Sequence, residues 1–236
     1  MDIQKDEPKS LELSSQLVSI ITTEHYNLQT GRSMTISETT GRASLFLSTV
    51  SSTLVALAFV GQIAHLGVAF FVFSLVLFPS LLFLGLVTFE RVLQSSIEDT
   101  IYARGINRLR HLYLEYAPQM EPYFILSHYD DNVGIMTNMG VHGSWWQTFL
   151  SMPGMIEVIN SILTGAFVGL LLYAIFLGAS ATFAQTALAL VLCALGGIVS
   201  FLMSVLLHQR YQLIQWQRAD KHLAVRFPSP AVSEKA

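Results

Sequence analysis

The fold is decided by two apolar stretches that follow one another closely, ASLFLSTVSSTLVALAFVGQIA at residues 43–64 and LGVAFFVFSLVLFPSLLFLGLVTF at residues 66–89. Neither stretch contains Lys, Arg, Asp or Glu. A helix needs roughly 20 apolar residues to cross the hydrocarbon core of a bilayer. The two stretches therefore predict a hairpin of two transmembrane helices.

A second pair of apolar stretches predicts a second hairpin. They cover residues 155–177 and 183–207, and Gly178, Ala179 and Ser180 supply the small residues of a tight connection. Only 12% of the chain is charged, compared with about 25% in a typical soluble domain. The sequence therefore predicts an all-α integral membrane protein with two transmembrane helical hairpins and amphipathic cytoplasmic helices.

The segments outside the spans carry helical periodicity. From residue 11 to 36 one face holds apolar positions three and four apart, which favours packing on another cytoplasmic helix over lying on the membrane surface. After the second span a coiled-coil-like seam is formed by Tyr102, Ile106, Leu109, Tyr113 and Tyr116, with Arg104, Arg108 and Arg110 off the seam. The predicted regions are 1–42 (tail and amphipathic helix), 43–89 (first hairpin), 90–154 (cytoplasmic helix and loop), 155–207 (second hairpin) and 208–236 (C-terminal helix and tail).

The basic residues predict the orientation in the membrane. All thirteen Lys and Arg residues lie outside the two hairpin connections, and Lys and Arg near a span are retained in the cytoplasm. We therefore expect both termini and the central segment on the cytoplasmic side of a plasma (inner) membrane. A cleaved signal peptide is not expected. Aromatic residues at the membrane interface are predicted to be Trp145, Trp146 and Trp216.

Three spans carry stripes of small and polar residues at helical spacing. They comprise Ser44, Ser48, Ser51 and Ser52 in the first span, Glu157, Asn160, Ser161 and Thr164 in the third, and Gly196, Ser200, Ser204 and His208 in the fourth. Helices in lipid associate through such residues, and water-filled paths are lined by them. The stripes are therefore interpreted as a pore or packing face. Gly165 and Gly169 form a helix-packing pair, and Pro79 predicts a kink in the second span.

Glu157 is the single acidic residue in the predicted spans. An ionisable group at membrane depth indicates a functional site, because hydrocarbon does not solvate charge. Glu157 also lies close to the start of its span, where a carboxylate in the headgroup region suits the helix dipole. Both interpretations, a cavity or pore position and a helix-terminal position, follow from the sequence.

Other chemistry is weakly represented. The chain contains no catalytic motif or phosphate-binding loop, so no enzyme activity or cofactor is expected. Cys193 is the single cysteine, which excludes an intrachain disulfide. The loop residues His128, Tyr129, Asp130 and Asp131, with His142 downstream, lack the spacing of a metal site and are interpreted as a solvated loop. The net charge of −3 argues against a nucleic-acid partner.

The order of helices resembles that of a class of bacterial defence proteins. An N-terminal helix, two membrane hairpins and cytoplasmic extensions are similar to the SLATT and four-transmembrane effectors. The segments EHYNLQT at residues 24–30 and TGRASLFL at residues 40–47 also resemble uncharacterised bacterial multi-pass membrane proteins. The resemblance implies an effector that self-associates and permeabilises the inner membrane when a partner signals.

Three functions are compatible with this sequence. The leading hypothesis is a homo-oligomeric pore or channel-like effector in the lipid bilayer. The first alternative is a non-conducting scaffold or sensor subunit that recruits a cytoplasmic protein, and it requires both serine stripes to pack dry against neighbouring spans. The second is a small-solute transporter with a cavity near Glu157 and Asn160.

Overall fold

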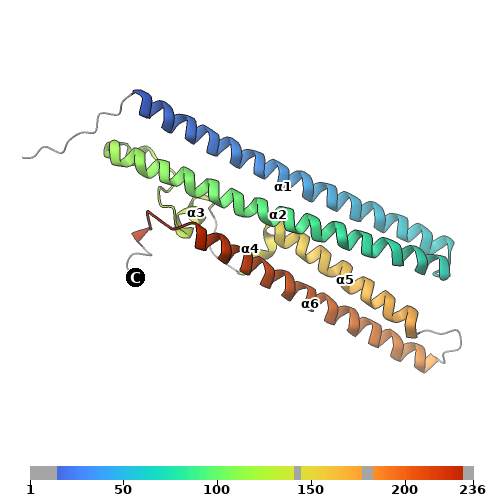
Figure 1. Cartoon of the computed structure of the whole chain (residues 1–236). Helices are drawn as coiled ribbons and strands as arrows, with labels where there is room; N and C mark the ends of the chain where they lie inside the picture. Colours follow the sequence, from blue (N-terminus) through green and yellow to red (C-terminus); the bar gives the residue numbers. More distant parts are fainter. Residues whose placement is uncertain (1–14, 141–144, 177–182, 231–236) are drawn as a thin grey trace, which may run out of the picture. The chain divides into compact units, whose positions relative to one another are not determined.

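The computed structural model describes residues 15–140, 145–176 and 183–230, and every regular element in them is a helix. Four long helices dominate the chain, and three short helical segments join the second to the third of them (Figure 1). The elements are α1 (Ser15–Ile63), α2 (Val68–Tyr116), η1 (Pro118–Tyr123), α3 (Asn132–Asn138), α4 (Trp145–Leu150), α5 (Met152–Phe176) and α6 (Phe183–His222). The predicted all-α class is thereby confirmed.

Helices α1, α2, α5 and α6 are each long and apolar enough to cross a membrane, as a multi-pass membrane protein requires. Helix α1 is continuous, so the predicted N-terminal helix and the first span form a single element. Helix α2 likewise continues past Pro79 and beyond the predicted second span. The charged tail at residues 1–10 and the connection at residues 178–180 lie outside the described residues.

The chain divides into two compact units. We call residues 37–96 and 144–221 the span unit, because they contain all four predicted spans. The remaining residues, 1–36, 97–143 and 222–236, form the polar unit.

A short turn joins α1 to α2 in the span unit. His65 and Leu66 both adopt left-handed backbone conformations, with φ of 47° and 56°. The Leu66 N–H donates to the Gly61 carbonyl at 3.1 Å and thereby closes the end of α1. Non-glycine residues rarely adopt this conformation, at a cost of roughly 1–2 kcal/mol each.

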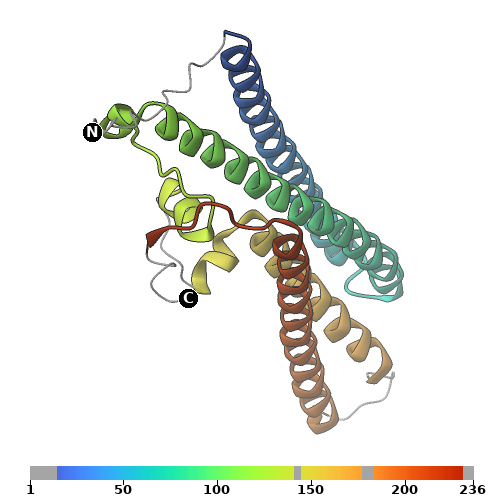
Figure 2. The same ribbon diagram turned by 60° about the vertical axis from the view of Figure 1, so that its left-hand side comes forward.

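Within the span unit, α1 and α2 lie side by side (Figures 1 and 2). The buried positions of α1 recur four and three residues apart and form a seam, which consists of Thr39, Ala43, Phe46, Val50 and Leu57. Gly85 of α2 is buried close to the Phe46 ring. The core of this unit therefore combines a heptad-like seam with close approach at a glycine.

The polar unit is held together by polar contacts between the parts of α1 and α2 that belong to it. The Arg32 guanidinium pairs with Asp99 at 2.8 Å. The His25 imidazole hydrogen-bonds the Tyr113 hydroxyl at 2.8 Å, and the two rings stack. The face of α1 that carries His25 thus contacts α2 in the polar unit.

Candidate functional site

A polar cluster lies buried between α5 and α6 in the span unit. The Glu157 carboxylate is completely buried. It accepts hydrogen bonds from Gln209 Nε2 at 2.8 and 2.9 Å and from Gln212 Nε2 at 2.6 Å. Gln209 and Gln212 are three residues apart on α6 and so share one helix face. The carboxylate is therefore held by two neutral amides of the neighbouring helix.

Two serines form a second contact between the same pair of helices. The Ser161 hydroxyl donates to Ser204 Oγ at 3.0 Å, and both residues are buried. His208 Nδ1 lies 2.8 Å from the Ser204 carbonyl oxygen, so Nδ1 is the donor and carries a proton. The His208 ring also meets the Phe89 ring edge to face at 4.7 Å.

Asn160 lies one turn from Glu157 on α5 and is 1% exposed. Neither its Oδ1 nor its Nδ2 atom has a hydrogen-bond partner among the described residues. A methyl group added at Gly85 of α2 would overlap Asn160 Oδ1. The absence of a side chain at Gly85 therefore makes room for the Asn160 amide.

Glycines bring α5 and α6 into close contact. A Cβ at Gly165 would lie 2.7 Å from the Gly197 carbonyl oxygen, and one at Gly169 would lie 3.4 Å from the Cys193 carbonyl oxygen. Gly196, on the predicted fourth-span stripe, has no room for a Cβ because the Leu172 side chain fills that space. The close backbone approach is the kind of contact that small residues permit in lipid.

The serine stripe of α1 has a different environment. Ser44, Ser48, Ser51 and Ser52 are all exposed. We call these four serines the hydroxyl face. The same exposed face continues with small residues at Ser37, Gly41 and Ala58 and with the larger apolar residues Val55 and Phe59, each three or four residues from a neighbour on the face. Each residue turns an α-helix by about 100°, so a position two residues from the seam points about 200° away from it. The hydroxyl face therefore lies opposite the buried seam of α1.

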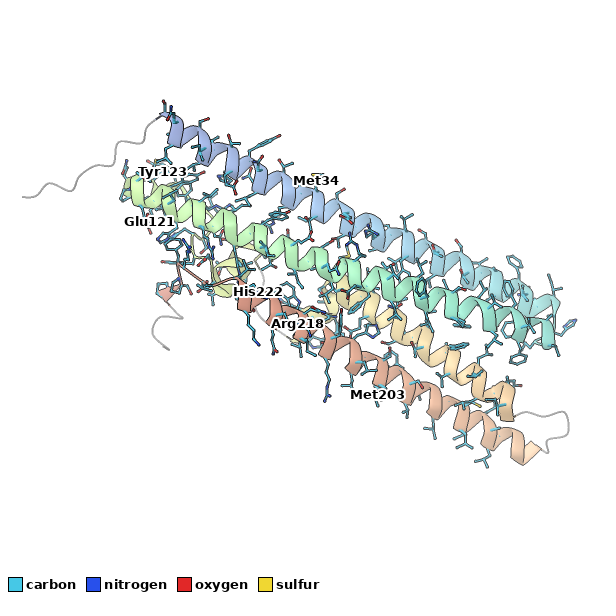
Figure 3. All side chains as sticks on the ribbon, viewed as in Figure 1. Met34, Glu121, Tyr123, Met203, Arg218 and His222 are labelled. Atoms are coloured by element: carbon cyan, nitrogen blue, oxygen red, sulfur yellow. The ribbon has the colours of Figure 1, made fainter. Side chains whose placement is uncertain are left out.

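The remaining predicted residues lie apart from the buried cluster. Thr164 Oγ1 donates to the Asn160 carbonyl at 2.8 Å, within its own helix. Ser200 and Trp216 are half-buried on α6, Pro79 is exposed on α2, and Trp146 is 58% exposed on α4. Figure 3 shows Met203 and Arg218 on the outer side of α6, whereas Ser204 is buried. Trp145 begins α4, and its side chain lies outside the described residues.

The loop that contains Asp130 and Asp131 binds the chain's own C-terminal segment in the polar unit. We call residues 223–229 the strap. Asp130 is completely buried and accepts hydrogen bonds from the Phe227 N–H at 2.8 Å and from Arg108 Nε at 2.7 Å. The Arg226 N–H donates to both carboxylate oxygens at 3.1 Å. Asp131 accepts hydrogen bonds from the Ser229 and Gly134 N–H groups, both at 2.7 Å.

These donors explain why the pKa values of both aspartates are lowered. Burial alone would raise the pKa of Asp130, but the Phe227 and Arg226 N–H groups and the Arg108 guanidinium outweigh it and hold the pKa below its usual value. Burial is likewise outweighed at Asp131, whose pKa is lowered by hydrogen bonds from Ser229 and Gly134. No three metal-ligating side chains converge anywhere in the described part of the chain, and His142 lies outside it.

Several of these residues were not predicted from the sequence as site residues. No role was predicted for Gln209, Gln212 or Gly85. One signal was available, because Ser204, His208 and Gln212 recur four residues apart, with Gln209 beside His208, where the apolar part of α6 ends. The partners of the strap are distant in sequence, since Asp130 and Arg226 are 96 positions apart.

The fold and these contacts define an all-helical chain with four helices able to cross a membrane and a buried polar cluster between two of them. No known protein family, curated protein or solved structure matches the chain.

Proposed function

We propose that this chain is a homo-oligomeric, pore-forming protein of the bacterial inner membrane, similar in role to the small helical defence effectors. The observation that carries the proposal is the exposed hydroxyl face of α1, within a helix that is apolar enough to span a membrane. The buried stripes of α5 and α6 do not line the path, because Ser161 and Ser204 bond each other inside the span unit. The path is lined by α1.

The physical argument rests on what suits each surface of a membrane helix. Large apolar side chains such as Leu45 and Leu54 are exposed on α1 beside the hydroxyl face and suit lipid tails. A face of hydroxyls and small side chains suits water or the close approach of another helix. In a ring of copies, the hydroxyl face meets water and its small flanking residues meet the next copy.

Thiol accessibility tests the lining. In a Cys193→Ala background, Ser48→Cys in reconstituted vesicles is expected to react with a membrane-impermeant thiol reagent, because water reaches it. Ser80→Cys is the matched control, since Ser80 is an exposed serine in the span portion of α2, outside the hydroxyl face. Equal, negligible reaction at both positions would contradict the proposal.

Conductance gives the second test of the pore. Replacing Ser48 and Ser51 by Leu narrows and dries the path, so single-channel conductance is expected to fall by about tenfold, for an added barrier of about 1.4 kcal/mol. Ser80→Leu is expected to leave conductance unchanged. Wild-type protein that forms a discrete oligomer but never conducts would contradict the pore.

Contacts within the polar unit support a cytoplasmic location for both chain ends. Arg32, which precedes the first span, pairs with Asp99, which follows the second. The strap, which follows the fourth span, bonds Asp130 in the central segment. Segments that touch one another belong on one side of the bilayer, and their basic residues favour the cytoplasmic side. A cysteine at His65, in the α1–α2 turn, is expected to be labelled from outside intact cells.

A scaffold or sensor subunit is the second candidate. It requires both serine stripes to pack dry, and the contact of Ser204 with Ser161 favours it for the stripe of α6, whereas the stripe of α1 is exposed. Under this proposal a second copy covers the hydroxyl face without water, and a cytoplasmic protein binds the polar unit. An oligomer with unreactive Ser48→Cys and no conductance supports the scaffold and rejects the pore. A small-solute transporter has less support, because Asn160 is packed against Gly85.

A further inference from the structure

The Glu157 carboxylate lacks a cationic partner. Its donors are the amides of Gln209 and Gln212, which are neutral. Among the described residues no Lys, Arg or His side chain forms an ion pair with Glu157. A fully buried carboxylate without a counter-charge is costly, and amide hydrogen bonds offset only part of that cost.

Charged groups that α1 and α2 contribute to the span unit have partners other than Glu157. Glu38 pairs with Arg42 at 2.8 Å and with Arg91 at 3.5 Å. On α2, Glu90 hydrogen-bonds the Tyr211 hydroxyl of α6. His208 also faces the cluster, and its Nδ1 donates to the Ser204 carbonyl. Its buried Nε2 has no hydrogen-bond partner among the described residues.

A second observation points to the same place. Asn160, one turn along α5 from Glu157, is 1% exposed and has both amide atoms unpartnered among the described residues. Positions three apart on a helix are neighbours on its surface. Glu157 and Asn160 are thus neighbouring positions of α5, the carboxylate bonded to α6 and the amide oxygen facing Gly85 of α2 without a donor. Carboxylate and amide oxygens together are ligands for a hard cation.

We propose that Glu157 and Asn160 hold one monovalent cation inside the span unit. The cation is either a proton on the Glu157 carboxylate or an alkali ion bound by that carboxylate and the Asn160 amide oxygen. Because the site has a single carboxylate, the bound cation carries one charge. A divalent ion would leave a net positive charge buried. Gln209 and Gln212 adapt to the cation by turning their amides, since an amide presents a donor on one side and an acceptor on the other. The site requires no pore and belongs to the protein whether or not it conducts.

Thermal unfolding of the full chain in lipid nanodiscs tests the alkali ion. Sodium or potassium chloride is exchanged for N-methylglucamine chloride at equal ionic strength and pH. If an alkali ion occupies the site, the wild-type midpoint falls by at least about 3 °C without it. Glu157→Gln abolishes this dependence. Glu98→Gln is the matched control, because Glu98 is an exposed carboxylate, and it retains the wild-type response.

Infrared spectroscopy of the same samples tests the proton. If a proton occupies the site, wild type and Glu98→Gln show the C=O stretch of a buried carboxylic acid at neutral pH, and Glu157→Gln lacks it. His208→Gln keeps the band, which separates Glu157 from the neighbouring imidazole. Wild-type protein with neither the band nor any alkali dependence overturns the proposal, and that measurement does not require any variant to fold. An alkali response or a band that survives in Glu157→Gln overturns it as well.

Discussion

Asp130 and Glu157 are both completely buried carboxylates, and the two units of the molecule hold them by opposite means. In the polar unit, Asp130 meets the Arg108 guanidinium and two backbone N–H groups. In the span unit, Glu157 meets two neutral amides. The difference is the cationic donor, because an opposite charge offsets the cost of burying a carboxylate more fully than neutral donors do. In the polar unit the protein itself balances the buried charge, whereas in the span unit the donors around the carboxylate are neutral.

Neutralising each carboxylate in turn is expected to give the largest difference between the units. Asp130→Asn puts an amide N–H₂ group against N–H donors, and it removes the partner of Arg108. We expect a cost of about 2–3 kcal/mol, because the donors of the strap and a partly buried guanidinium lose their acceptor. Hydrogen exchange at the Arg226 and Phe227 amides, followed by mass spectrometry, should accelerate on the order of 100-fold.

Glu157→Gln is expected to change the unfolding free energy of the span unit by less than about 1 kcal/mol, because the neutral amide removes the buried carboxylate together with its need for a balancing cation, which offsets the hydrogen bonds that are weakened. Glu24→Ala, at an exposed position of α1, is the control for both variants. If Glu157→Gln costs as much as Asp130→Asn, the two carboxylates are held by equally strong interactions and the comparison fails.

Adding a methyl group to one glycine in each unit should give the next largest effect. At Gly85 the methyl group overlaps Asn160 Oδ1, and the Phe46 ring lies 3.0 Å from it. We expect Gly85→Ala to destabilise the span unit by about 1–3 kcal/mol, as overpacking of a close-packed interior does. Thermal unfolding in detergent or nanodiscs measures it.

Gly105→Ala in the polar unit is the matched comparison. The methyl group there meets only the ends of the flexible Leu28 side chain, at 3.1 and 3.2 Å. The gain of about 1 kcal/mol in helix propensity should offset this contact. The double variant Gly85→Ala, Asn160→Ala should recover most of the loss, since it removes the overlapping amide. Equal losses at the two glycines would show that tight packing is not particular to the span unit.

The spans could be predicted from the sequence because an uncharged apolar run of this length is typical of a membrane helix, but the partners of the buried acids could not. Glu157 was predicted as an acid within a span, yet its contact with Gln209 depends on the register between α5 and α6, which no local pattern encodes. Arg104 was placed off the helical seam, whereas it is 3% exposed and donates to the Leu223 carbonyl of the strap. Such contacts join segments distant in the chain, and periodicity within one helix does not report them.

Acid is expected to release the strap only at low pH, where the two aspartates take up protons. Its effect on the strap near neutral pH is therefore the smallest of the expected effects. The pKa values of Asp130 and Asp131 are lowered in the folded chain from an ordinary value of 3.8. A depressed pKa means that the unfolded state binds more protons, so the stabilisation is fully present above the unfolded pKa and is lost as pH falls through the folded one. Exchange at the Phe227 amide, corrected for its intrinsic pH dependence, should therefore stay constant from neutral pH down to about pH 5 and rise only below about pH 4.

The same titration sharpens the contrast between the two means of holding a carboxylate. In Asp130→Asn, the remaining rise below about pH 4 should shrink, because Asp131 alone then titrates against the strap. Opening of the strap in wild type between about pH 5 and pH 7 would mean that neither aspartate controls it.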